Sequence, residues 1–194
     1  MDSSPALLVV SGPPGSGKTT LAHLIAGQVG CPAICRDEIK EGMVHAIPGF
    51  APDGAHAPAI PDAAAHELNL RTLPAFFGVL ELLLRAGVTT VAEAAFQDHI
   101  WRPRLEPLRE LARIRVVHCR VPAEVAHARV VRRLAGDPSR RAHGDRPAAD
   151  AAGHAPGHDG FVRPALGVPE LEVDTTQGYA PGLDAIVRLL DGVS

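Results

Sequence analysis

Residues 12–19 read Gly12-Pro13-Pro14-Gly15-Ser16-Gly17-Lys18-Thr19, which is the pattern G-x-x-x-x-G-K-[ST]. In this pattern a glycine-rich backbone curls so that successive N–H groups surround phosphate groups. The segment before it, 6–10, is an apolar run typical of a buried parallel strand, and 19–26 has apolar residues at helical spacing. A strand, this loop and a helix in that order predict a phosphate-binding site at the start of the helix.

The loop residues are each expected to make a different contact with a bound nucleotide. Lys18 would reach the β- and γ-phosphates, and the hydroxyl of Thr19 would ligate Mg²⁺. The other loop residues, with Thr20 behind them, would surround the phosphates: Gly12, Pro13, Pro14, Gly15, Ser16 and Gly17. The sequence therefore predicts ATP and Mg²⁺ as cofactors.

Length, composition and charge restrict the number of domains, the binding partners and the cellular compartment of the protein. The 194 residues, 46% of them hydrophobic, fit one domain with its own core. A net charge of −3 gives no general attraction to nucleic acid or membranes, and no run reaches the roughly 18 apolar residues of a membrane span. Three cysteines without paired spacing, and a first apolar run that leads into the phosphate loop, favour a reduced, cytoplasmic protein.

Strand and helix signals alternate along the rest of the chain. Strands are expected at 32–35, 88–96, 114–121 and 170–174. Helices are expected at 36–45, 62–85, 101–113, from Pro122 onward and at 181–191, and Pro74 should kink or split the second of these. This alternation predicts an α/β domain with a mainly parallel, five-stranded sheet and helices on both faces.

Further candidate residues follow the strands, where ligands bind at the carboxyl edge of a parallel sheet. Asp37 comes directly after the second strand and is expected to take the proton of a substrate hydroxyl, although Asp is also a common helix N-cap. Glu93 in the third strand is expected to hold the Mg²⁺ shell, and Asp98 is an alternative for that role.

The layout resembles the small P-loop kinases, a group with an AAA-type ATP-binding domain that includes polynucleotide 5′-hydroxyl kinases, chloramphenicol phosphotransferase, gluconate kinase and zeta-type toxins. The resemblance covers nearly the whole chain and rests on 12–19, 36–40, 91–96, the arginine-bearing helix and 171–176. It implies a P-loop NTPase three-layer sandwich formed by a single domain, 1–194. Within that domain, about 136–160 would be a basic lid and about 47–61 an acceptor-side insertion.

The resemblance also implies roles for arginines. Arg129 and Arg133 would line the nucleotide, and lid arginines such as Arg140 would neutralise the transferred phosphoryl group. Arg132 and Arg141 are alternatives, and a solvated basic face is the simpler interpretation of the whole set. Lys40 stands where the group often has an arginine, which leaves anion binding on the acceptor side open. The lid histidines match no zinc spacing and are expected to be surface residues: His143, His154 and His158.

The expected reaction is in-line transfer of the γ-phosphoryl group of ATP to a hydroxyl of a small molecule. An antibiotic is one attractive acceptor, because 172–176 is similar to chloramphenicol phosphotransferase. Segment 47–61 would shape the acceptor pocket together with His66, Asn69 and Arg71.

A polynucleotide 5′-hydroxyl kinase is the nearest alternative. The acidic balance, one Trp and one Tyr weigh against it, since they leave few platforms for base stacking. A nucleotide-hydrolysing regulatory module and a zeta-like toxin are further alternatives. The sequence indicates neither the acceptor, nor a choice between ATP and GTP beyond a bias to ATP, nor the oligomeric state.

Overall fold

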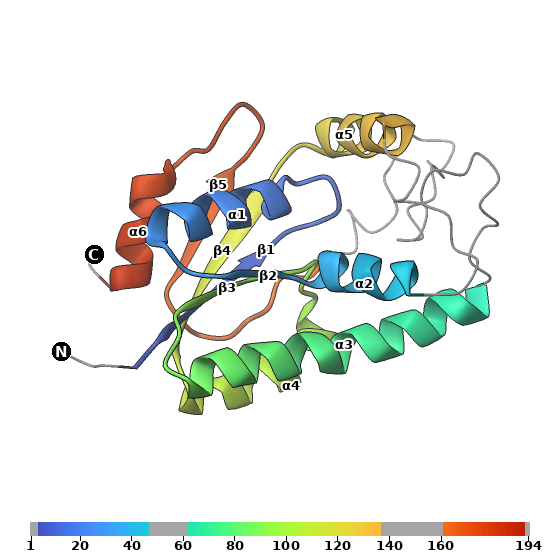
Figure 1. Cartoon of the computed structure of the whole chain (residues 1–194). Helices are drawn as coiled ribbons and strands as arrows, with labels where there is room; N and C mark the ends of the chain where they lie inside the picture. Colours follow the sequence, from blue (N-terminus) through green and yellow to red (C-terminus); the bar gives the residue numbers. More distant parts are fainter. Residues whose placement is uncertain (1–3, 47–61, 137–160, 193–194) are drawn as a thin grey trace.

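The computed structural model describes residues 4–46, 62–136 and 161–192. In these ranges five strands form one sheet: β1 (Ala6–Ser11), β2 (Ala33–Cys35), β3 (Thr90–Glu93), β4 (Arg113–Arg120) and β5 (Glu170–Asp174). Their order is β2-β3-β1-β4-β5, and every pairing between them is parallel (Figure 1). The predicted α/β sheet is confirmed, and within the described ranges it is wholly rather than mainly parallel.

Helices cover both faces of the sheet. They are α1 (Lys18–Val29), α2 (Arg36–His45), α3 (Asp62–Arg85), α4 (Asp98–Leu105), the 3₁₀ helix η1 (Glu106–Glu110), α5 (Ala123–Gly136) and α6 (Leu183–Asp191). Helices α1 and α6 lie on one face and α3 and α4 on the other, while α2 and α5 stand near the carboxyl ends of the strands (Figure 1). None of the helices in the described part of the chain has the length and apolar character needed to cross a bilayer.

The hydrophobic core consists of two clusters, one on each face of the sheet, and β1 contributes residues to both. This strand is buried along its whole length, because it lies between β3 and β4 with helices above and below. Alternate residues face opposite sides: Leu7 packs with Phe76 and Trp101, whereas Leu8 packs with Leu21. The apolar run before the phosphate loop is therefore the central strand of the sheet, as its composition predicts.

Helix α3 runs through Pro74 without a break, so of the two effects predicted for Pro74, a kink or a split, the split is wrong. A proline inside a helix removes the donor for the carbonyl four residues earlier, here that of Leu70. Pro74 is exposed, and Leu70 is 57% exposed, so the freed carbonyl lies on the face open to solvent. Water can satisfy it there, which lowers the cost of continuing the helix.

Two other elements differ most from their predicted bounds. The helix predicted at 101–113 is instead α4 followed by η1, because Pro107 in η1 lacks the N–H that would continue the α-helical ladder. The strand predicted at 88–96 forms its ladder only at β3, whose pairing with β1 ends where Val10 meets Glu93.

Strand β5 is one edge of the sheet and has the predicted bounds. Its residues Glu170 and Glu172 are exposed. At its end, Asp174 forms an antiparallel bridge with Ala180, whose two backbone hydrogen bonds are 2.8 and 3.0 Å long. The proposed insertion at 47–61 lies outside the described residues, as do all but the first residue of the proposed lid at 136–160.

Candidate functional site

The glycine-rich loop joins β1 to α1 and places glycine where a side chain would not fit. Gly15 has a φ of 78°, and a Cβ there would overlap the backbone of Ala126 in α5. A Cβ on Gly12 would lie 2.6 Å from the Ser16 hydroxyl oxygen. Gly17, with a φ of 79°, is the N-cap of α1. The loop thus ends at a helix N-terminus, whose unpaired N–H groups favour a bound anion.

Lys18 and Thr19, the first residues of α1, both contact Glu93 at the end of β3. The Lys18 ammonium lies 3.6 Å from Glu93 Oε1, and the Thr19 hydroxyl donates a hydrogen bond to Oε2 over 3.1 Å. Glu93 is 1% exposed, and its Oε1 has no hydrogen-bond partner among the described residues. Burial raises the pKa of the Glu93 carboxyl, and the charge of Lys18 opposes that rise.

These residues fit Mg²⁺. A buried carboxylate with an unsatisfied oxygen, next to a threonine hydroxyl, supplies the hard oxygen donors that this ion prefers. Thr19 and Glu93 would hold the ion, with water and phosphate oxygens as further ligands. The alternative, Asp98, is engaged elsewhere: it accepts the N–H of Ala165 over 2.9 Å and pairs with Arg102 at 3.4 Å.

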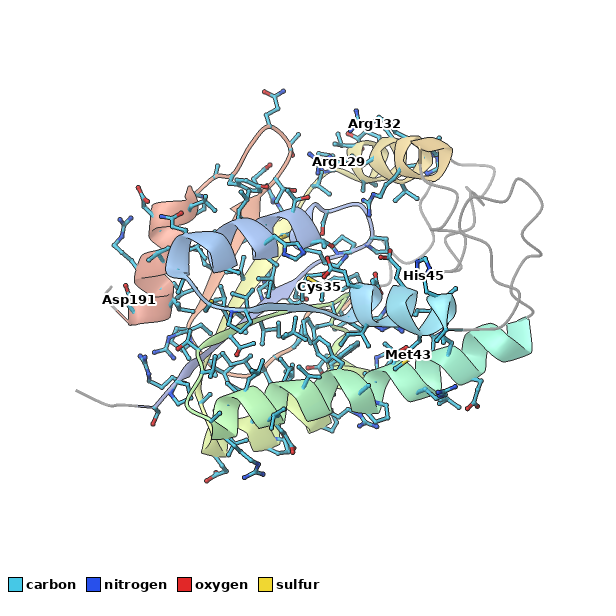
Figure 2. All side chains as sticks on the ribbon, viewed as in Figure 1. Cys35, Met43, His45, Arg129, Arg132 and Asp191 are labelled. Atoms are coloured by element: carbon cyan, nitrogen blue, oxygen red, sulfur yellow. The ribbon has the colours of Figure 1, made fainter. Side chains whose placement is uncertain are left out.

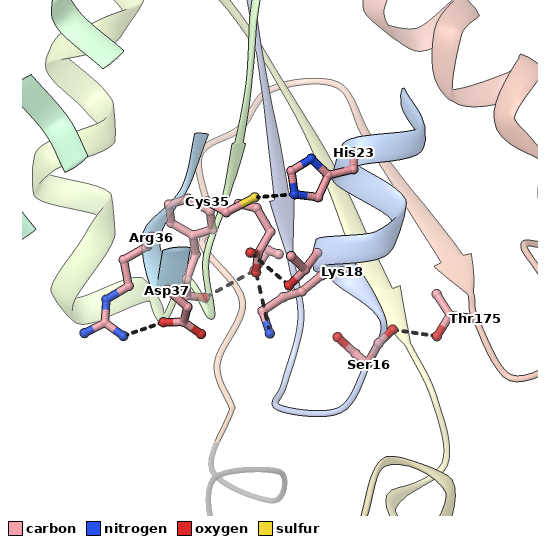
Figure 3. Close-up of polar contacts among 11 residues, drawn as sticks. Ser16, Lys18, His23, Cys35, Arg36, Asp37 and Thr175 are labelled. Carbon is pink, nitrogen blue, oxygen red and sulfur yellow. Dashed lines mark hydrogen bonds and ion pairs between the residues drawn. The ribbon is translucent and has the colours of Figure 1, made fainter. Parts of the chain in front are cut away.

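Asp37 lies in the first turn of α2, directly after β2. Arg36 Nη1 donates to its carboxylate over 2.9 Å, and Arg36 Nη2 donates to Asn69 in α3 over 2.7 Å. The N-cap of α2 is Cys35, so Asp37 does not have the N-cap role considered from the sequence. The Asp37 side chain is 46% exposed, and Figure 3 shows its carboxylate on the same side of the sheet edge as the Lys18 ammonium.

A cavity of about 780 Å³ opens beside the loop. It is lined by α1, by α5 and by the segment after β5. The α5 residues in it are Arg129, Arg132 and Arg133, and Figure 2 shows the first two extending from that helix. Three arginines around one cavity next to Lys18 give it a positive field suited to a nucleotide polyphosphate. Arg140 and Arg141 lie outside the described residues.

Arg129 connects three parts of this site. Its Nη2 donates to the carbonyl oxygens of Thr175 and Thr176 over 2.6 and 3.1 Å, and its Nη1 donates to that of Gly15 over 3.4 Å. The Thr175 hydroxyl donates to the Ser16 carbonyl oxygen over 2.7 Å. Arg129 thus joins α5, the phosphate loop and the segment after β5. The sequence predicts neither this junction nor the place of Thr175 in it, because the partners are far apart along the chain.

The acceptor side is described only in part. Asn69 contacts Arg36, and Arg71 is exposed. Lys40 is 3% exposed, so the structure buries the cation considered for acceptor binding within α2 and its neighbours. The side chain of His66 lies outside the described part of the chain, as do all three lid histidines.

Comparisons with known proteins agree with this geometry. A family model described as AAA domain matches residues 7–150. No curated protein matches the sequence. A candidate kinase from Chloroflexus aurantiacus is similar in structure, with a TM-score of 0.77, 22% identity and coverage of 98% of this chain and 99% of that one.

Two further solved structures share the arrangement of elements. The APS kinase CysC of Mycobacterium tuberculosis, in complex with AMPPNP and APS, has a TM-score of 0.64 at 16% identity, with 97% of this chain and 98% of that one covered. A gluconokinase from Sinorhizobium meliloti has a TM-score of 0.53 at 23% identity, with 98% and 92% covered. At these identities the likeness shows a common fold, and the predicted P-loop NTPase fold is confirmed.

Proposed function

We propose, from the premise that the chain belongs to the AAA domain family, that it is a kinase transferring the γ-phosphoryl group of ATP to a hydroxyl of a small molecule. One observation supports this most. Arg36 holds the half-exposed carboxylate of Asp37 at the sheet edge where Lys18 also lies. A carboxylate in that place suits deprotonation of an acceptor hydroxyl that attacks the γ-phosphate.

Each residue has a distinct part in the proposed transfer. Lys18 and the loop N–H groups bind the β- and γ-phosphates, and Arg129 and Arg133 offer guanidinium N–H groups to the nucleotide. Asp37 accepts the hydroxyl proton as the acceptor oxygen attacks the γ-phosphorus and the bond to the β-phosphate oxygen breaks. When bound, Mg²⁺ supplies charge neutralisation at the phosphate oxygens. Catalysis is then mainly positioning and electrostatic stabilisation.

The burial of four of the six aromatic side chains that the structure describes favours a small-molecule acceptor over a nucleic acid. Phe76, Phe77, Phe96 and the single tryptophan, Trp101, pack together in the core and are at most 8% exposed. Non-specific strand binding uses exposed aromatic faces on which bases stack.

The test is a screen of ATP consumption with purified protein and Mg²⁺. The acceptors are sugars, nucleosides, hydroxylated antibiotics and oligonucleotides with a free 5′-hydroxyl. We expect ADP release that depends on one small-molecule class, with a phosphorylated product seen by mass spectrometry. Phosphorylation of oligonucleotides alone would support the polynucleotide kinase alternative. Equal ATP hydrolysis with and without every acceptor would overturn the proposal in favour of a hydrolysing module.

A further inference from the structure

Three side chains outside the phosphate loop meet at one point, where two of them contact the same imidazole nitrogen of the third. His23 extends from α1, Cys35 ends β2, and Glu38 lies in the first turn of α2. His23 Nε2 is 2.6 Å from Glu38 Oε1 and 3.7 Å from Cys35 Sγ, and the three donor atoms all lie within 4.8 Å of one another. Figure 3 shows the ring nitrogen of His23 directed at the sulfur of Cys35.

This geometry is not that of a thiol nucleophile with its base. In a catalytic triad the carboxylate holds the ring nitrogen opposite the one that faces the nucleophile. Here the thiol and the carboxylate share Nε2, so Glu38 cannot orient the ring for deprotonation of Cys35. Burial and nearby carboxylates also raise the pKa of the Cys35 thiol. What the cluster offers is a sulfur, a nitrogen and an oxygen donor facing one point.

We propose that His23, Cys35 and Glu38 form a binding site for a divalent cation of the zinc class. Tetrahedral zinc, with bonds of about 2.3 Å to sulfur and about 2.0 Å to nitrogen, holds those two atoms about 3.5 Å apart. The observed separation of Cys35 Sγ and His23 Nε2 is 3.7 Å. Glu38 needs a shift of less than about 1 Å away from the ring nitrogen, and its side chain, 47% exposed, is free of the packing that would prevent this.

The surrounding charge favours a cation at this point. Glu93, Glu38 and Asp37 all act on the Cys35 thiol by their negative charge. A divalent ion takes the place of the thiol proton, leaves the thiolate as ligand and offsets those charges. The half-exposed His23 and Glu38 leave a path by which an ion can enter, and water would fill the fourth position.

The ligand types separate this site from the one proposed for Mg²⁺. Sulfur and imidazole select Zn²⁺ or Co²⁺, whereas Thr19 and Glu93 offer only oxygen. The two sites are neighbours, because Cys35 is paired with Glu93 in the register of β2 and β3. The inference goes beyond the proposed kinase function, and its test uses no nucleotide, so either proposal can fail without the other.

The test uses Co²⁺ as a spectroscopic probe for Zn²⁺, with excess Mg²⁺ present to occupy oxygen sites. We expect one Co²⁺ per chain, with a thiolate-to-cobalt charge-transfer band that added Zn²⁺ removes. Cys35→Ser should abolish the band. His23→Gln and Glu38→Gln should each weaken Co²⁺ affinity by about 10-fold or more, since even outer partners of a metal ligand change affinity about 10–100-fold. Cys31→Ser, at a half-buried cysteine outside the cluster, should keep band and affinity.

Thermal unfolding supplies a second measurement that also shows whether each variant folds. Zn²⁺ should raise the midpoint of the wild-type protein relative to EDTA, because it binds the folded chain, and should leave that of Cys35→Ser unchanged. The proposal is overturned by a wild-type protein that shows no band with Co²⁺, by a band that survives Cys35→Ser, or by a band that Cys31→Ser removes as well.

Discussion

The Thr19 hydroxyl donates a hydrogen bond to Glu93 Oε2 over 3.1 Å, which joins the first turn of α1 to the end of β3. Lys18 pairs with the other carboxylate oxygen of the same residue. The two residues proposed to hold Mg²⁺ are therefore already in contact, and Glu93 connects the ion site to the phosphate-binding lysine.

Replacing Glu93 by Gln should weaken Mg²⁺-dependent nucleotide binding. Glutamine keeps the size of the side chain and an oxygen for Thr19, but it removes the charge that attracts the ion. We expect affinity for a non-hydrolysable ATP analogue with Mg²⁺ to fall about 10–100-fold, measured by calorimetry. Glu172→Gln, at an exposed position on β5, should leave this affinity unchanged. Equal affinity in both variants would argue against Glu93 as an ion-binding residue.

Asp37→Asn should abolish phosphoryl transfer while leaving ATP affinity nearly intact. The amide cannot accept the acceptor proton, and loss of a general base lowers the rate about 10²–10⁴-fold. The readouts are the single-turnover rate and the ATP dissociation constant, with the exposed Glu67→Gln in α3 as a matched control. If ATP binding fails in Asp37→Asn while the control behaves normally, Asp37 serves the structure of the site instead of the chemistry.

Gly15 and Gly27 should respond in opposite ways to replacement by Ala. Gly15 has a φ of 78° and no space for a Cβ beside Ala126. Gly15→Ala should lower the free energy of unfolding by at least about 1–3 kcal/mol. Gly27, in the exposed part of α1, has no atom within 4 Å of an added Cβ apart from its chain neighbours and the nearby backbone of its own helix. Gly27→Ala should stabilise by about 0.5–1 kcal/mol. Urea unfolding measures both, and a Gly15→Ala protein as stable as wild type contradicts the packing described.

Arg129→Met should loosen the junction between α5, the loop and the segment after β5. The carbonyls of Thr175 and Thr176 lose a charged donor, and hydrogen bonds to charged groups are worth about 1.5–3 kcal/mol each. We expect a loss of that order, reduced by partial solvent exposure, in urea unfolding. Arg132→Met, at an exposed position in the same helix, should change stability by less than about 0.5 kcal/mol. Equal effects would mean that the junction adds no stability.

His118→Asn should reduce the dependence of stability on pH in mildly acidic solution. Burial lowers the pKa of His118 below its ordinary value of 6.5, and Glu170, 3.3 Å away, opposes this together with Glu172, whereas Arg163 adds to it. The unfolded chain therefore binds more protons than the folded one as pH falls below 6.5. His118 therefore leaves the free energy of unfolding unchanged well above pH 6.5 and lowers it as the pH falls below that value.

Urea unfolding of wild type and His118→Asn at about pH 7.5 and about pH 5.5 checks this linkage. The wild-type protein should lose more stability between the two conditions. A variant with the same loss would show that other groups carry the dependence.

The sequence predicts the phosphate loop, its flanking elements and the parallel sheet, because these depend on local pattern. A glycine-rich loop between an apolar run and a segment with helical spacing is compatible with few structures other than a strand, a phosphate loop and a helix. The bounds of α3 were predicted correctly, but the split considered at Pro74 does not occur. The cost of a proline depends on whether the freed carbonyl faces water, and tertiary packing decides that.

The contacts of Cys35 and Arg129 could not be predicted in the same way. His23 and Cys35 meet because α1 packs on the sheet while β2 pairs with β3, and their spacing along the chain has no periodic meaning. Arg129 and Thr175 are 46 positions apart. Both contacts are products of topology, which becomes visible only when the strand order is known.

The outer strand β5 bears on whether another molecule can add a strand to this sheet. Open sheet edges offer unpaired N–H and C=O groups on which another molecule can add a strand. Two glutamates on β5 oppose such an approach, and the bridge from Asp174 to Ala180 uses part of the edge within the chain itself. The opposite edge, β2, is only three residues long before α2 begins. Strand addition by another molecule is thus opposed at both edges of the sheet. At β5 it is opposed by charge and by pairing within the chain, and at β2 by the short length of the strand.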